Sequence, residues 1–211
     1  MGYTHSWKQN RDFKDSEWDL ITNDFKKLLE NLPESSESAG GFYSNEPLKI
    51  VGVEGKVIVK KKNGTILGLP QCNEYEISFN GGGGELIKNN PGHRPYYELS
   101  HEGFRLTKSA QVESAKLFCK TDRKPYDLIV CAVLISAKIH SPKGIIVRSS
   151  GELEDWTPAL KLVRKVLTPT WNSLAKNRFT KAYLFSNWLD YAEKIQNVGI
   201  KNKNVLSEER V

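Results

Sequence analysis

An apolar run that follows a proline sets the strongest limit on the fold: LIVCAVLI at residues 128–135, after Pro125. Proline favours the first turn of a helix, and the residue before a proline avoids helical dihedral angles. Asp127 stands where a first turn favours a carboxylate, and the run extends to Ile139. The β-branched residues in the run leave a buried strand as the alternative. We expect a buried helix at about residues 125–139.

Strand patterns come mostly in one block, and helical patterns lie around it. Asn63-Gly64 is a strong hairpin signal between two of the strand patterns. Segregated strands and helices indicate an α+β fold with a central, mostly antiparallel sheet and packed helices. The expected strands are 2–7, 48–53, 56–62, 65–69, 74–80 and 144–150, and the other expected helices are 16–32, 151–167 and 181–196.

The composition is that of an ordinary globular protein. The chain has 211 residues, of which 38% are hydrophobic and 27% charged. We expect a single α+β domain over residues 1–167 and a helical C-terminal extension with a mobile tail over 168–211. No apolar run approaches the roughly 18 residues of a membrane span, and the amino terminus lacks a secretory pattern. The expected location is therefore the cytoplasm.

The charge balance favours acidic partners. Thirty-one basic residues against twenty-five acidic ones give a net charge of +6, and the cations are spread along the chain. This bias favours a phosphate-bearing small molecule and leaves nucleic acid open as a partner. Four histidines and three cysteines show no ligand spacing, so no metal or cofactor is expected.

The segment FCKTDRKPYD, residues 118–127, places cations just before the expected helix. Lys120, Arg123 and Lys124 stand there together with the hydroxyl of Thr121. The first N–H groups of a helix and its positive dipole end attract anions, and a guanidinium can bind phosphate in a bidentate manner. We expect an anion site here. The alternative is a solvated loop whose cations neutralise surface carboxylates.

Four residues are considered as catalytic candidates. His101 and Glu102 could act as an acid–base pair, together with Asp127. Adjacent residues of a strand point to opposite faces, so His101 and Glu102 would share a site only in a loop or bulge. Cys119 could be a nucleophile beside cations, although a buried cysteine is the simpler interpretation.

Five pieces of the chain carry a family resemblance: MGYTHSW at 1–7, FNG at 79–81, HEGF at 101–104, FCKTDRKPYD at 118–127 and VRSSGELEDW at 147–156. Together they resemble a family of small uncharacterised proteins found chiefly in bacteriophages and their bacterial hosts. The resemblance implies a phage context and, for a phage protein, the host cell cytoplasm; it implies no reaction. Ser150 stands where the family usually has aspartate, which removes one candidate base or metal ligand.

We expect a binding protein that holds a phosphate-bearing, nucleotide-like ligand, and the phage context suggests sequestration of a host defence signal. One alternative is a nucleotide or phosphoester hydrolase that uses His101, Glu102 or Asp127. Another is a nucleic-acid-binding protein that uses Lys60, Lys61 and Lys62. Whether the protein is an enzyme stays open, and so does its oligomeric state, with a homo-oligomer compatible. The expected ligand-binding residues are His5, Asn80, Lys120, Thr121, Arg123, Lys124, Ser149 and Ser150.

Overall fold

The fold is that of a computed structural model of the protein, which describes part of the chain. Contacts divide the chain into Met1–Thr168 and Pro169–Val211, and every described residue belongs to the first unit. The expected helical extension therefore lies outside the described residues. The described residues are 3–35, 48–53, 57–61, 64–82, 99–110 and 117–167.

Antiparallel sheets and three helices make up the described part of the chain, which confirms the α+β fold. The helices are α1 (Asp15–Glu30), α2 (Asp127–His140) and α3 (Leu153–Val166). The strands are β1 (Thr4–Gln9), β2 (Lys49–Val51), β3 (Val57–Lys61), β4 (Gly64–Leu67), β5 (Gln71–Cys72), β6 (Glu76–Gly82), β7 (Phe104–Thr107), β8 (Leu117–Lys120) and β9 (Ile145–Ser149).

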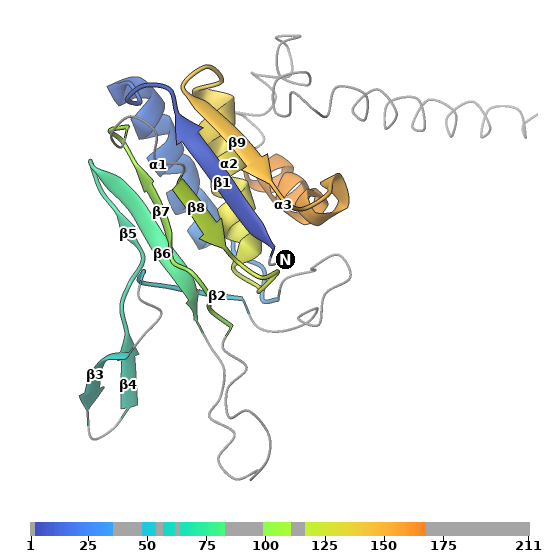
Figure 1. The fold of residues 1–211 in the computed structure, drawn as a ribbon. Helices are drawn as coiled ribbons and strands as arrows, with labels where there is room; N and C mark the ends of the chain where they lie inside the picture. The colour runs from blue at the N-terminus through green and yellow to red at the C-terminus, as the bar shows by residue number, and fades with distance from the viewer. Residues whose placement is uncertain are drawn as a thin grey trace, which may run out of the picture. The chain divides into compact units, whose positions relative to one another are not determined.

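Two sheets carry most of the strands. In the first, β1 lies between β8 and β9 and is antiparallel to both. In the second, β6 pairs with β2 and β5 and also with β7. The hairpin expected around Asn63-Gly64 is present as β3 and β4, with Lys61 opposite Gly64. Figure 1 shows β1, β8 and β9 on the viewer's side of α2.

Aromatic side chains connect the two sheets with α1. Trp7 of β1 contacts Phe104 of β7, with 5.0 Å between ring centroids. Phe104 contacts Phe79 of β6, which stacks on Phe25 of α1. All four rings are at most 2% exposed. This continuous apolar contact holds both sheets against the same helix, because each ring buries a large apolar area.

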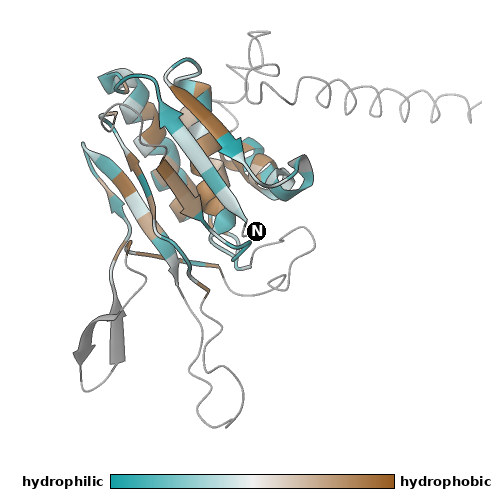
Figure 2. Cartoon of the chain, viewed as in Figure 1, coloured by the Kyte–Doolittle hydropathy of each residue, from teal (hydrophilic) through white to brown (hydrophobic). Residues whose placement is uncertain are grey.

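The apolar run forms α2, so the helix prediction is confirmed and the strand alternative is wrong. At 14 residues, α2 is about 21 Å long, and most of its residues are buried. Asp127 lies in its first turn, while Lys138 and His140 lie in its last turn, as the helix dipole favours. Figure 2 shows hydrophobic residues along α2, whereas β1 in front of it is mostly hydrophilic.

Two local expectations are wrong. The helix expected at 16–32 spans Asp15–Glu30 and begins after Lys14. The backbone N–H of Lys14 donates to the Glu17 carboxylate, which fixes this start. The strand expected at 74–80 continues through Gly81 and Gly82, which belong to β6. A Cβ at Gly81 would lie 2.1 Å from the Leu99 carbonyl oxygen, so this strand needs glycine where another backbone segment approaches closely.

No helix among the described residues has the length and apolar character needed to cross a membrane.

A buried carboxylate joins α1 to α2. Asp24 of α1 is 3% exposed and accepts hydrogen bonds from the Ser136 hydroxyl, at 2.8 Å, and from Nε2 of His140, at 2.7 Å. Both donors belong to α2. Because all three groups are buried, each depends on the others for its hydrogen bonds.

We expect Asp24→Ala to lower the free energy of unfolding by about 3 kcal/mol, because it leaves two buried donors without an acceptor. Urea denaturation followed by circular dichroism measures the loss. Asp19→Ala is the matched control, since Asp19 is exposed on the same helix. Equal losses in the two variants would show that the buried network does not stabilise the fold.

Candidate functional site

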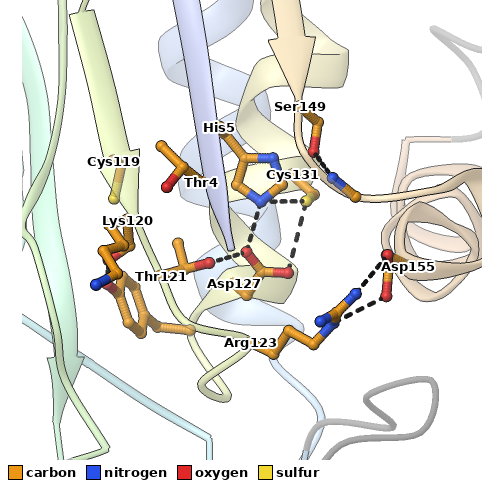
Figure 3. A network of polar contacts seen from close by, with 12 residues as sticks. Thr4, His5, Cys119, Lys120, Thr121, Arg123, Asp127, Cys131, Ser149 and Asp155 are labelled. Carbon is orange, nitrogen blue, oxygen red and sulfur yellow. Dashed lines mark hydrogen bonds and ion pairs between the residues drawn. The ribbon is translucent and has the colours of Figure 1, made fainter. Parts of the chain in front are cut away.

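The candidate site is a network of polar side chains at the start of α2, which we call the His5 cluster: His5, Thr121, Asp127 and Cys131 (Figure 3). Nε2 of His5 lies 2.7 Å from Oδ1 of Asp127 and 3.6 Å from Sγ of Cys131. The Thr121 hydroxyl donates to the same Oδ1 at 2.5 Å. His5 and Thr121 are fully buried, and the Asp127 side chain is 14% exposed. One carboxylate therefore accepts bonds from two buried donors.

Strand and helix geometry bring the cluster together. In β1, buried His5 and Trp7 alternate with more exposed neighbours, so His5 points toward α2. Asp127 and Cys131 are four residues apart on α2 and therefore lie on one face of it. His5 pairs with Cys119 across β8 and with Ser149 across β9.

A tight turn places Thr121 against Asp127. The backbone N–H of Lys124 donates to the carbonyl of Thr121, and the two residues between have positive φ, 53° at Asp122 and 58° at Arg123. Positive φ at both central residues is the pattern of a type I′ turn, and it costs more for a long side chain such as arginine than for glycine. The contacts of Arg123 offset this cost.

Arg123 forms an ion pair within the protein. Its Nε and Nη2 donate to the two carboxylate oxygens of Asp155 in α3, at 3.1 and 3.0 Å. Its guanidinium lies 4.3 Å from the ring centroid of Tyr3. The pKa of Arg123 is raised above its ordinary value, and its hydrogen bonds to Asp155 are the largest cause. Its charge is therefore compensated by a carboxylate.

Hydrogen bonds also occupy the first turn of α2. The N–H groups of Asp127, Leu128 and Ile129 donate to the carbonyls of Lys124, Pro125 and Tyr126, respectively. Lys124 and Tyr126 are buried, at 8% and 0% exposure. An anion at this helix end would have to compete with these bonds.

The remaining predicted site residues lie in two other places. Asn80 donates to the carbonyls of Val53 and His101, and the side chain of His101 is exposed. The Glu102 carboxylate accepts from the backbone N–H of Lys120 at 2.7 Å. Among the described residues, no hydrogen bond or ion pair joins Asn80, His101 or Glu102 to His5.

Ser149 and Ser150 form local hydrogen bonds at the end of β9. The Ser149 hydroxyl accepts from the N–H of Gly151, and the Ser150 hydroxyl accepts from the N–H of Thr4. A Cβ at Gly151 would lie 2.5 Å from the ring of Tyr3, so glycine allows β1 to approach this turn.

The buried thiols are poor nucleophiles. Burial raises the pKa of Cys119 to about 12, and burial, followed by the charge of Asp127, raises the pKa of Cys131. Asp127 and Cys131 both approach Nε2 of His5, whereas a catalytic triad uses the two ring nitrogens for its two partners. Nδ1 of His5 has no hydrogen-bond partner among the described residues. The His5 cluster therefore lacks the geometry of a cysteine hydrolase.

The other side of the first sheet is different in character, and we call it the open face. It consists of the outward side chains of β8, β1 and β9. Phe118 is 61% exposed and Ile146 41% exposed, and Lys8 and Arg148 are exposed too. The open-face residues are Thr4, Ser6, Lys8, Phe118, Lys120, Ile146 and Arg148.

Sequence reasoning missed Tyr3, Asp155 and the contact of Cys131 with the cluster. Tyr3 and Asp155 both lie in pieces of the family resemblance, so those pieces carried the available signal. The hydroxyl of Tyr3 is buried and has no hydrogen-bond partner in the described part of the chain. Burial, followed by the charge of Asp127, raises the pKa of this hydroxyl. Cys131 belongs to the apolar run, which was expected only as a buried helix.

Comparison with protein-family models, with curated proteins and with solved structures finds no match to this chain. The phage-family resemblance therefore stays a prediction.

We expect Thr121→Val to lower the free energy of unfolding by about 2 kcal/mol, because the hydroxyl bonds to an ionised carboxylate. Chemical denaturation measures this loss. Thr22→Val is the matched control: Thr22 is 8% exposed, and its hydroxyl donates to the neutral carbonyl of Asp19. In the control, the free energy of unfolding should fall by about 1 kcal/mol or less. A larger loss in the control would contradict the importance of the Asp127 charge.

Proposed function

We propose that the protein binds a phosphate-bearing, nucleotide-like molecule, and that the open face holds it. The observation that supports this proposal is an exposed aromatic ring beside cations on a sheet surface. Phe118 and Arg148 both pair with Ser6, one from each side, so they lie about 10 Å apart across β1. Lys120, opposite Thr4, lies two residues from Phe118 on the same face.

The charges of the open face favour an anion. Lys8, Lys120 and Arg148 form no ion pair with any described residue. None of the open-face residues carries a carboxylate. Arg123, by contrast, is already paired with Asp155. Available cations therefore lie on the open face, and a phosphate there would not have to displace a carboxylate.

Phe118 supplies a platform for a base. A planar base covers an exposed ring with little change in the protein, and such stacking contributes about 1–3 kcal/mol per base. The phage resemblance suggests sequestration of a nucleotide signal from a host defence system as the use of such binding.

Single-stranded nucleic acid is the second candidate, because a flat face with an aromatic ring and dispersed cations also suits a chain of nucleotides. The side chains of Lys60, Lys61 and Lys62, which were expected to engage it, lie outside the described part of the structure. The hydrolase alternative has less support, since the His5–Asp127 pair is buried and His101 is held near Asn80 only through its backbone.

Phe118→Ala should weaken binding of a fluorescent adenine nucleotide about 5- to 100-fold, because it removes the stacking surface. Fluorescence titration measures the dissociation constant. Tyr75→Ala is the control, since Tyr75 is a similarly exposed aromatic residue, at 69% exposure, on another part of the surface. If the control weakens binding as much as Phe118→Ala, the open face is not the site.

Charge reversal at Lys120 and Arg148 tests the electrostatic part and separates the two candidates. In the double variant Lys120→Glu/Arg148→Glu, we expect the slope of log affinity against log salt concentration to fall by about 2, one for each phosphate contact. Lys161→Glu, at an exposed position of α3, should leave the slope unchanged. Measurement with a mononucleotide and with a short oligothymidylate identifies the ligand class. Affinity that grows with strand length favours nucleic acid, and equal affinity favours the small molecule.

A further inference from the structure

Three residues of the His5 cluster bring different metal-binding atoms close together. Nε2 of His5, a carboxylate oxygen of Asp127 and Sγ of Cys131 all lie within 4.8 Å of one another. Asp127 and Cys131 lie on successive turns of α2, and His5 lies on β1, which faces this helix. We infer that these three residues form a transition-metal site and that zinc is the ion that fits it.

The distances between the donor atoms support a tetrahedral ion. Zinc bonds of ~2.1 Å to nitrogen and ~2.3 Å to sulfur place these two atoms about 3.6 Å apart. The distance from Nε2 of His5 to Sγ of Cys131 is 3.6 Å, and that from Sγ to Oδ2 of Asp127 is 3.8 Å. Nε2 of His5 contacts the other carboxylate oxygen, Oδ1, at 2.7 Å, and this distance would open by about 0.7 Å if Oδ1 were the ligand atom.

The donor set selects the class of metal. One imidazole, one thiolate and one carboxylate suit zinc or cobalt, whereas magnesium and calcium prefer oxygen ligands only. The Thr121 hydroxyl donates to Asp127 and so orients the carboxylate, as the outer partners of metal ligands do. The cluster thus contains both ligands and a group that positions one of them.

Three ligands leave one position of a tetrahedron for water or for a group of a bound molecule. His5 and Cys131 are buried, at 0% and 1% exposure, whereas the Asp127 side chain is 14% exposed. Access to the ion would therefore lie on the side of Asp127.

Binding of the metal ion releases one proton from the protein. The Cys131 thiol releases its proton to solvent and bonds as thiolate, Asp127 binds as carboxylate, and neutral His5 carries its proton on Nδ1. Nδ1 has no acceptor among the described residues, which opposes binding. Three coordinate bonds outweigh this single unmade hydrogen bond. A bound divalent ion also reverses the effect of burial on the thiol, because it stabilises the thiolate.

The test uses the full-length protein and cobalt(II) alone as a probe, with no nucleotide present. We expect one cobalt ion per chain and a thiolate-to-metal charge-transfer absorption in the near ultraviolet. Zinc should displace the cobalt and remove the absorption, and added zinc should raise the melting temperature of chelator-treated protein. Wild-type protein that binds no cobalt and shows no zinc-dependent melting shift would overturn the inference.

Two cysteine variants assign the ligand. Cys131→Ser should abolish the charge-transfer absorption, whereas Cys119→Ser should keep it. Cys119 is a suitable control because it is equally buried and lies opposite His5 on β8, yet it bonds to the carbonyl of Glu102. Absorption that survives in Cys131→Ser, or that is lost in folded Cys119→Ser, would contradict the assignment.

Asp127→Asn provides a second variant should Cys131→Ser not fold. It keeps the shape of the side chain, and we expect it to weaken zinc binding at least about tenfold. Unchanged zinc affinity in this variant would exclude Asp127 as a ligand. Because these measurements use metal alone, the metal site can fail while nucleotide binding holds, and the reverse is also possible.

Discussion

The burial of α2 is the constraint on which the rest of the structure depends. A helix covered on most sides cannot leave its polar groups to water, so each must find a partner inside the protein. Near its start, Asp127 accepts bonds from His5 and Thr121. Near its end, Ser136 and His140 donate to Asp24 of α1. Within the described part of the chain, α2 thus contributes to two such carboxylate networks, and the candidate site is one of them.

The sequence predicted those elements whose formation depends on residues close together in the chain. Pro125 and the length of the apolar run predicted α2, and Asn63-Gly64 predicted a hairpin. The strands β5, β7 and β8 were missed because they have only two to four residues, and their pairing depends on distant partners. The His5 cluster was missed as a unit for the same reason: 122 residues separate His5 from Asp127.

Successive side chains of β1 point to opposite faces of the sheet, and this alternation separates the two proposed sites. His5 and Trp7 point toward the helices, while Ser6 and Lys8 belong to the open face. Neighbouring residues of one strand therefore contribute to the proposed buried metal site and to the proposed exposed anion site. A shift of one residue in the register of β1 would exchange these two sets, so both sites depend on the same pairing with β8 and β9.

The polar residues of FCKTDRKPYD serve two purposes that its sequence does not distinguish. Thr121 bonds to Asp127, Arg123 to Asp155, and the Tyr126 hydroxyl to the carbonyl of Glu102. These three contacts hold the turn, the helix and the neighbouring loop together within the protein. Phe118 and Lys120, from the same segment, face outward because β8 alternates. Polar character alone therefore does not mark a ligand site; a cation is available for an anion only where no carboxylate of the protein already neutralises it.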